Sequence, residues 1–257
     1  MGPFRRFLKA AGVAWVFLAG LLAVSLLFPA AGLCGRHAAD RMRGRIAVHW
    51  YGTLARILGL KIGRSGAPIM GNGLLVANHV SWLDIVALGS LAPLDFVAKQ
   101  EVAQWPLVGY LGRRVGTLFL RRGDPESSRL ITEEMAWRLR RGRRLVLFPE
   151  GTSSAGTEVL RFHARLFQPA LLAHVPVQAV ALAYRGKARD FAPFIGDDEF
   201  LPHLWRLLSL DALEVDVSFH TQVPPEGLDR NALAGYTRNQ IAETLGRPFG
   251  PAVLRAG

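Results

Sequence analysis

The chain has 257 residues, half of them hydrophobic, and its 31 lysine and arginine residues against 20 acidic ones give a net charge of +11. This length allows one large domain or two small ones with a substantial core. The single cysteine, Cys34, excludes an internal disulfide and a cysteine-based metal cluster. A basic excess is typical of proteins that bind nucleic acid or an anionic membrane surface, and the position of the charges distinguishes the two.

An apolar segment near the start of the sequence favours the membrane. No charged residue occurs from Ala10 to Gly35, a stretch long enough to cross a bilayer. Basic residues flank this stretch on both sides, namely Arg5, Arg6, Lys9, Arg36, Arg41, Arg43 and Arg45. Such flanks bind lipid head groups at the cytoplasmic face, and the segment is too long for a typical signal-peptide core. It suits a single membrane span as well as a re-entrant helix pair in one leaflet.

The next segment, from His37 to Lys61, has the pattern of a basic amphipathic helix. Its apolar residues recur at helical spacing, at Ile46, Trp50, Leu54, Ile57 and Leu58. A helix of this kind lies in a membrane interface or packs its apolar stripe on the core of a domain. A turn-rich linker follows over residues 64–73. We therefore expect membrane-anchoring and amphipathic helices over residues 1–62 and a separate domain over residues 63–257.

In the rest of the chain, short apolar runs alternate with helical patterns. Strands are predicted at residues 73–76, 94–98, 115–120, 144–148, 177–184 and 214–219, and helices at 85–91, 125–141 and 229–245. The helix at 125 has an N-cap at Asp124 and a stop at Gly142. This alternation predicts an α/β domain with a layered mixed sheet flanked by helices, preceded by the N-terminal membrane-associated helices.

A polar loop with the residues of a general base follows the apolar run 73–76. It contains Asn78 and His79, and Asp84 comes about one helical turn later. A carboxylate beside an imidazole fixes its tautomer and stabilises the imidazolium, so that the pair can remove a proton from a hydroxyl. The alternative interpretation is a polar turn that caps a helix, with Asp84 exposed and His79 idle.

A second polar region extends from Lys99 to Arg122, and a third loop, Pro149 to Ser154, follows the strand at 144–148. Loops at the ends of strands form the sites of α/β domains. The third loop is also within one residue of the hydrolase motif Gly-x-Ser-x-Gly, which would make Ser153 a nucleophile, although two residues separate the strand from the turn. A non-catalytic protein that docks on membranes would explain residues 1–61 but not the three polar loops.

Taken together, the three loops resemble the PlsC-type glycerolipid acyltransferase family, also called the lysophosphatidic acid or 1-acylglycerol-3-phosphate acyltransferase family. The resemblance covers about residues 70–185. His79 and Asp84 match the His-x4-Asp block of the family, and residues 148–152 match its Phe-Pro-Glu-Gly-Thr block. The second block is matched by Lys99, Glu101, Pro106, Gly109, Gly116 and Arg122, and the fourth by Val175, Pro176 and Val177.

The resemblance implies an O-acyltransferase with a glycerolipid acyltransferase-like fold. Such an enzyme moves a fatty acyl group from an acyl carrier protein or coenzyme A thioester to the free hydroxyl of a lysolipid at the membrane. We expect no cofactor, no metal and no nucleic-acid partner. We expect the chain at the inner (cytoplasmic) membrane, with its catalytic domain facing the cytoplasm.

The resemblance also implies roles for individual residues. His79 would deprotonate the lipid hydroxyl and Asp84 would hold the imidazole. Lys99 and Arg122 offer cationic donors for an anionic head group. Gly151 and Thr152 bring backbone and hydroxyl donors toward the reacting oxygen. Glu150 either contacts the acceptor or holds the loop by a hydrogen bond.

Two departures from the family pattern concern the acceptor. Ser153 stands where members that form phosphatidic acid usually carry arginine, and Arg121-Arg122 replaces the commoner Asp-Arg. Lyso-ornithine lipid acyltransferases of the same family act on an aminolipid that lacks phosphate, which a serine suits. Because Lys99 and Arg122 remain as phosphate ligands, we expect 1-acylglycerol-3-phosphate as the acceptor, giving phosphatidic acid, with lyso-ornithine lipid as the alternative.

Overall fold

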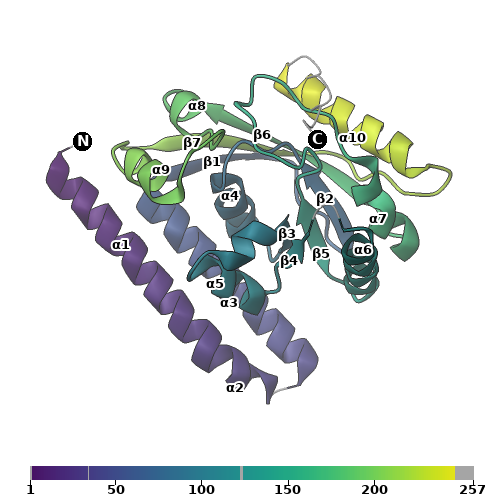
Figure 1. Ribbon diagram of the computed structural model, residues 1–257, viewed down its shortest axis with the longest axis horizontal. Helices are drawn as coiled ribbons and strands as arrows, with labels where there is room; N and C mark the ends of the chain where they lie inside the picture. The colour runs from purple at the N-terminus through teal and green to yellow at the C-terminus, as the bar shows by residue number, and fades with distance from the viewer. Residues whose placement is uncertain (1, 34, 122–123, 247–257) are drawn as a thin grey trace.

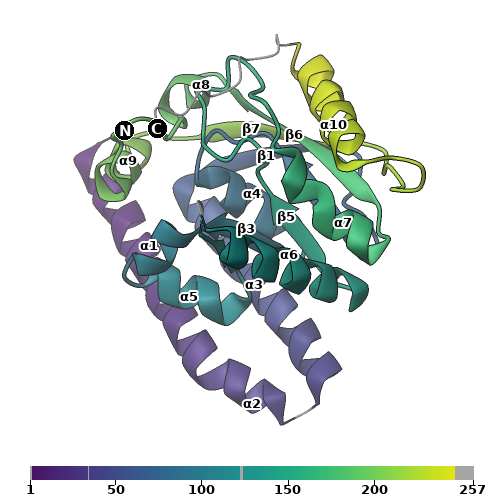
Figure 2. The ribbon, with the colours of Figure 1, turned by 45° about the vertical axis from the view of Figure 1, so that its right-hand side comes forward.

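A mixed sheet of seven strands lies at the centre of the computed structural model, which describes residues 2–33, 35–121 and 124–246 (Figure 1, Figure 2). Its strand order is β1-β7-β6-β2-β5-β3-β4. The strands are β1 (Leu60–Ser65), β2 (Gly73–Ala77), β3 (Asp95–Lys99), β4 (Leu118–Leu120), β5 (Arg144–Leu147), β6 (Val177–Arg185) and β7 (Leu213–Phe219). Neighbouring strands are parallel except β6 and β7, which are antiparallel. The predicted layered mixed sheet is confirmed.

Helices cover both faces of this sheet. They are α1 (Pro3–Leu22), α2 (Phe28–Gly32), α3 (Arg36–Leu58), α4 (Leu83–Leu91), α5 (Val108–Val115), α6 (Pro125–Arg140), α7 (Gln168–Ala173), α8 (Ala188–Phe191), α9 (Phe200–Leu207) and α10 (Arg230–Leu245). A π-helical turn, η1 (Ala23–Leu27), and two 3-10 turns, η2 (Gln100–Gln104) and η3 (Ala164–Phe167), complete the elements.

Two hydrophobic cores follow from the alternation of side chains along the strands. In β2, Leu75 packs in the core that α1, α3 and α4 share with the sheet. Leu74 and Val76 point to the opposite face, where α6, α7 and α10 pack. All three side chains are fully buried, which is why β2 reads as a continuous apolar run and lies at the centre of the sheet.

The predicted element boundaries differ from the structure around β1 and β4. The helix expected to reach Lys61 ends at Leu58, because Gly59 takes a left-handed conformation. Residues 60–65 form β1, which replaces the end of the predicted helix and the start of the predicted linker. This strand is at the edge of the sheet, and its outward charged residues hide the apolar alternation. The predicted division after residue 62 falls within it. The strand expected from Val115 begins at Leu118, since Val115 ends α5 and Gly116 turns the chain.

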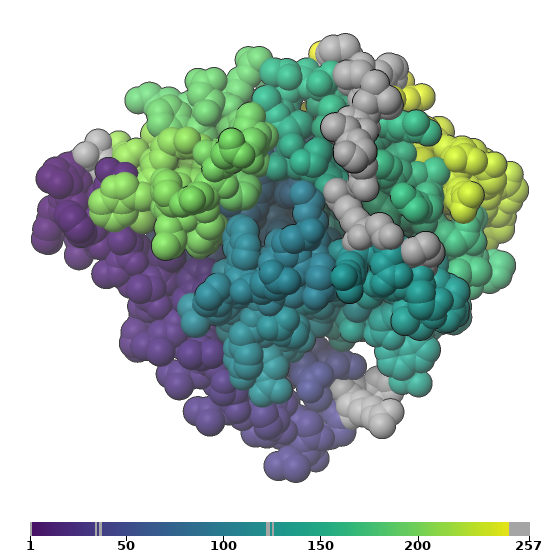
Figure 3. All heavy atoms as spheres, viewed as in Figure 1, coloured from purple at the N-terminus to yellow at the C-terminus, as the bar shows by residue number. Residues whose placement is uncertain are grey.

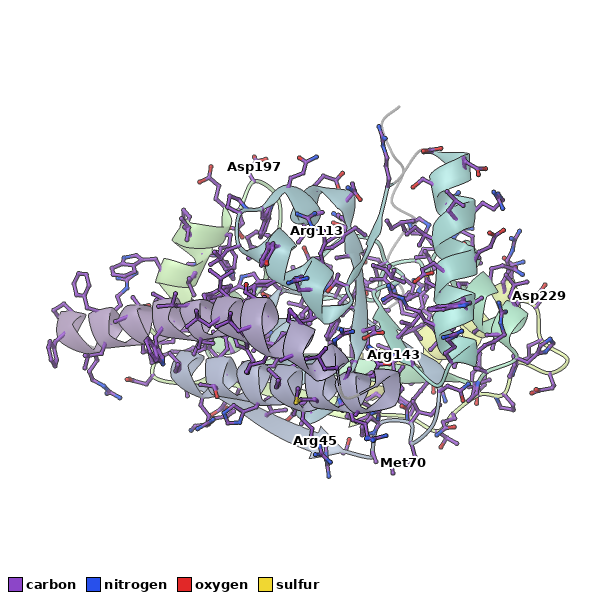
Figure 4. All side chains as sticks on the ribbon, turned by 90° about the horizontal axis from the view of Figure 1, so that it is seen from below. Arg45, Met70, Arg113, Arg143, Asp197 and Asp229 are labelled. Carbon is purple, nitrogen blue, oxygen red and sulfur yellow. The ribbon has the colours of Figure 1, made fainter. Side chains whose placement is uncertain are left out.

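The N-terminal segment forms a helical hairpin beside the sheet. Residues 3–32 form one helix that is long and apolar enough to cross a membrane, and α3 returns alongside α1 (Figure 4). The indole Nε1 of Trp50 in α3 donates to the carbonyl of Val16 in α1 at 2.8 Å. Large apolar side chains are exposed along this helix, namely Phe4, Phe7, Leu8, Trp15, Leu18, Leu22, Leu26 and Leu27.

Polar contacts fix the hairpin to the domain at both ends. Lys9 Nζ donates to the carbonyl of Leu210 at 2.7 Å, near the start of β7. At the other end, the guanidinium of Arg143 binds Asp95 of β3 through two hydrogen bonds of 2.6 and 2.9 Å and lies 3.5 Å from Asp40 of α3 (Figure 4). The arginine therefore joins α3 to the sheet, and its bidentate pairing with a buried carboxylate is directional.

Gly20→Ala tests the packing of the hairpin. A Cβ at Gly20 would lie 2.5 Å from Nε1 of Trp50, so the substitution should displace the indole and cost about 1–3 kcal/mol of unfolding free energy. The measurement is the thermal unfolding midpoint of purified protein in one detergent. Gly52→Ala is the control, because a Cβ at Gly52 meets nothing within 4 Å and the change should be neutral or slightly stabilising. Equal midpoints for the two variants would contradict this packing.

Candidate active site

The predicted site residues come together because the central strands run in the same direction. β2, β3, β5 and β6 are mutually parallel, so their carboxyl ends meet at one edge of the sheet. Asn78 and His79 directly follow β2, Lys99 ends β3, and the loop with Glu150 follows β5. Asn78 locks this edge, since its side-chain amide donates to the carbonyl of Leu182 at 3.0 Å and accepts from the amide of Leu182 at 2.8 Å.

His79 and Asp84 form a hydrogen-bonded pair. His79 Nδ1 lies 2.8 Å from Asp84 Oδ2, and the same oxygen accepts from the backbone amides of Val80 and Ser81 at 2.8 and 3.0 Å. Asp84 is fully buried in the first turn of α4, so the alternative interpretation with an exposed Asp84 is wrong. Since a carboxylate accepts only, Nδ1 carries the hydrogen and Nε2 carries the lone pair of a base.

The imidazole ring is held by the loop after β5. It stacks on the Phe148 ring at a centroid distance of 4.0 Å and an angle of 19°. The backbone carbonyl of His79 accepts from the amide of Ser154 at 2.9 Å, and its backbone amide donates to Glu150 Oε1 at 3.3 Å. These contacts fix the position of the ring. The side chain is still 21% exposed, so the ring remains accessible.

Glu150 is buried, and it links the loop after β5 to the backbone of His79. Its side chain is 2% exposed, and its Oε1 accepts from the backbone of His79. Burial raises the pKa of the Glu150 carboxyl to about 8, with the charge of Asp84 adding to the effect and the hydrogen bond from His79 opposing it. Of the two roles that the sequence left open for Glu150, this geometry supports the structural hydrogen bond.

An apolar cavity of about 650 Å³ opens beside the imidazole. Its walls come from the N-terminal hairpin, the helices at the edge of the sheet and the strands, and include Phe17, Gly20, Val24, Phe28, Ile46, Ala47, Trp50, Leu111, Val115, Ile131 and Met135. His79, Lys99, His163 and Arg165 add polar groups to this wall. Figure 3 shows the face on which α1 borders the segment around α5. A cavity of this size and lining suits a small ligand with an apolar chain.

Three of the remaining predicted residues line the same cavity. Lys99, Gly151 and Ser153 line it. Gly151 has a φ of 72°, and its amide donates to the carbonyl of Phe148 at 3.0 Å, so the glycine forms the turn itself. The Ser153 hydroxyl donates to the carbonyl of Phe194, and Thr152 beside it is half-buried. Arg122 lies outside the described residues.

Sequence reasoning missed two contributors to the site. Tyr184 donates its hydroxyl to Asp84 Oδ1 at 2.7 Å, and nothing in the apolar strand around it signals a contact a hundred residues away. The N-terminal hairpin supplies part of the cavity wall, whereas its sequence indicated an anchor. A helix surface that contacts lipid and one that lines a cavity are both apolar. The periodicity of apolar residues therefore cannot distinguish these two roles.

Comparisons with known proteins agree with this geometry. A family model described as Acyltransferase matches residues 61–183. A lyso-ornithine lipid O-acyltransferase from Pseudomonas aeruginosa is 45% identical over 213 residues, which cover 82% of this chain and 81% of that protein. The chain belongs to the acyltransferase family. The resemblance found in the three polar loops is therefore confirmed.

Two further relatives of this acyltransferase add detail. A 1-acyl-sn-glycerol-3-phosphate acyltransferase from Neisseria gonorrhoeae is 39% identical over 218 residues, covering 83% of this chain and 84% of that protein. The crystal structure of the 1-acyl-sn-glycerophosphate acyltransferase PlsC from Thermotoga maritima superimposes with a TM-score of 0.66 over 94% of this chain and 96% of that one. At 19% identity, this second likeness shows a shared fold.

Glu150→Gln tests the buried carboxyl. Because its folded-state pKa of about 8 exceeds the ordinary 4.5, the native state binds more protons than the unfolded state between these values. The contribution of Glu150 to stability therefore falls as the pH rises from about 4.5 to about 8. Glutamine is neutral throughout, so the variant should show a flatter slope of unfolding midpoint against pH. The exposed Glu226→Gln should keep the wild-type slope, and a wild-type slope in Glu150→Gln would refute the assignment.

Proposed function

We propose that this acyltransferase moves a fatty acyl group from an acyl carrier protein or coenzyme A thioester to the hydroxyl of a lysolipid at the membrane. The observation that carries the proposal is the imidazole of His79, paired with the buried Asp84, on the wall of an apolar cavity of about 650 Å³. A base that faces an apolar cavity is suited to a substrate whose reactive hydroxyl adjoins a hydrocarbon chain.

The reaction follows from the positions of these groups. Nε2 of His79 takes the proton of the lipid hydroxyl while its oxygen attacks the thioester carbonyl carbon. The resulting tetrahedral intermediate expels the sulfur, which takes the proton from the imidazolium and leaves as a thiol. Asp84 stabilises the imidazolium between the two proton transfers. The transfer is redox-neutral and needs no covalent enzyme intermediate.

Ser153 bears on the identity of the acceptor. The serine occupies the position at which phosphatidic-acid-forming members usually carry arginine, and its hydroxyl is engaged by the carbonyl of Phe194. We therefore propose lyso-ornithine lipid as the first acceptor, which reverses the order that the sequence motifs favoured. The name of the 45% identical relative supports this choice. Lysophosphatidic acid is the second candidate, supported by Lys99 on the cavity wall and by the 39% identical relative.

The helical hairpin supports a placement at the cytoplasmic face of the inner membrane. The helix over residues 3–32 carries exposed apolar residues such as Trp15, Leu18 and Leu26. Arg41 and Arg45 of α3 are exposed and can bind anionic head groups. Figure 4 shows Arg45 projecting outward from the hairpin. Because α3 packs against α1 and the domain, we propose that the hairpin enters one leaflet rather than spanning the bilayer. The thioester donors are then accessible from the cytoplasm.

His79→Ala tests the chemistry. Removing a general base should lower turnover by about 10²- to 10⁴-fold, and Asp84→Asn should lower turnover while vesicle binding stays unchanged. Acyl transfer is measured with labelled acyl carrier protein and, separately, acyl-coenzyme A, and binding by co-sedimentation with anionic vesicles. His49→Ala, an exposed position on α3, serves as the matched histidine control. Full activity of His79→Ala, or weakened docking with normal turnover for Asp84→Asn, would exclude these roles.

A competition assay tests the acceptor. Lyso-ornithine lipid and lysophosphatidic acid are offered together in mixed micelles with one labelled donor, and the two products are separated by thin-layer chromatography. We expect a higher kcat/KM for lyso-ornithine lipid, because the position after Thr152 lacks a cation for phosphate. A preference for lysophosphatidic acid would restore phosphatidic acid as the product.

A further inference from the structure

The second oxygen of the Asp84 carboxylate is held by a residue outside the polar loops. While Oδ2 accepts from His79, Val80 and Ser81, Oδ1 accepts from the hydroxyl of Tyr184 at 2.7 Å. Tyr184 is 5% exposed and Asp84 is fully buried, so this hydrogen bond is shielded from water. A charged acceptor in such surroundings gains more from a donor than it would at the surface.

The backbone of Tyr184 is fixed independently of the site. The residue lies next to the end of β6 and pairs with Val215 of β7 in the antiparallel part of the sheet. Its ring packs in the core that contains Leu83 and Leu182. Burial, together with the charge of Asp84, raises the pKa of the Tyr184 hydroxyl well above its usual value. The phenol therefore stays protonated and acts as a permanent donor.

Several charged or titratable groups lie near the carboxylate of Asp84. Each of them can contribute to the pH dependence of the activity. His79 adjoins Oδ2, and Glu150 approaches from the loop after β5 and interacts with the charge of Asp84. The positive charge of Arg238 in α10 lowers the pKa of Glu150, against the effect of burial. Among the side chains that the structure describes, Tyr184 is the one that donates to Oδ1, at 2.7 Å, and its raised pKa keeps the hydroxyl protonated.

We infer that Tyr184 is a positioning residue for acyl transfer, which acts through Asp84 on the basicity and orientation of His79. Its hydroxyl prevents rotation of the carboxylate, so that Oδ2 stays aligned with Nδ1 of His79. It also takes part of the negative charge of Asp84, so that less of this charge stabilises the imidazolium. The inference rests on the proposed general-base role of His79.

Tyr184→Phe removes the hydroxyl and keeps the ring. We expect kcat to fall about tenfold, the effect of losing one hydrogen bond to a charged group, with KM for both substrates changed less than threefold, roughly. The acid limb of the kcat/KM profile should move to higher pH, because the full charge of Asp84 then acts on the imidazolium. Unchanged kcat and pH profile, or a loss of activity without a shift of the acid limb, would overturn the inference.

Thr237→Val is the matched control for a lost buried hydroxyl. Thr237 is fully buried in α10 and donates to the carbonyl of Leu233 at 2.7 Å, within the core on the other face of the sheet. The variant should lose stability comparably but retain the kcat and the pH profile of the wild type. A shift of the acid limb in Thr237→Val would show that the pH profile reports global stability and would overturn the assignment to Tyr184.

A second readout separates this inference from the proposed function. The rate at which diethyl pyrocarbonate modifies His79, followed by mass spectrometry across pH, reports the protonation of its imidazole without turnover. Its midpoint should move to higher pH in Tyr184→Phe and stay constant in Thr237→Val, and an unmoved midpoint in Tyr184→Phe overturns the inference. If His79→Ala retains full acyl transfer while the midpoint in Tyr184→Phe still shifts, the proposed function fails but the coupling of Tyr184 to His79 stands.

Should Tyr184→Phe not fold, 3-fluorotyrosine at position 184 replaces it in the modification assay. Its hydroxyl is a stronger donor, so the midpoint should move to lower pH.

Discussion

The active site depends on one buried charge, the carboxylate of Asp84. A fully buried carboxylate is tolerated only if its lone pairs are satisfied, and here four donors supply that need. Three of the donors lie in the loop between β2 and α4 and the fourth near the end of β6, while Asp84 itself is in the first turn of α4. The electrostatic requirement of a single side chain thus fixes the relative positions of three elements and, with them, the orientation of the imidazole of His79.

Much of this arrangement was predictable from the sequence. The apolar runs placed the central strands, and the spacing of His79 and Asp84 matched a strand end followed by one helical turn. The edge strand β1 was missed, because its charged residues break the apolar alternation. The contact of Tyr184 was missed as well, since an interaction between residues a hundred positions apart depends on the register of β6 against β2, which local pattern does not encode.

The cavity shows that the two predicted regions share one site. Phe17 and Val24 from the first helix and Trp50 from α3 form its wall together with helices of the sheet domain. Some apolar residues of this hairpin therefore line the cavity, and others are exposed on the protein surface. The π-helical turn at Ala23–Leu27 lies where the helix passes the cavity, and Val24 within it is buried. Such turns are frequent at functional sites, where one extra residue re-aims the neighbouring side chains.

The connection between α3 and β1 has a mechanical consequence. α3 ends at Leu58 and β1 begins at Leu60, so Gly59 alone joins the hairpin to a strand that is hydrogen-bonded along its length to β7. A joint this short leaves little freedom for swivelling, and the bridge of Arg143 to Asp40 and Asp95 braces the other side. The hairpin is thus attached rigidly to the sheet. On any lipid surface that the hairpin enters, the distance between His79 and that surface is therefore set by the dimensions of the protein.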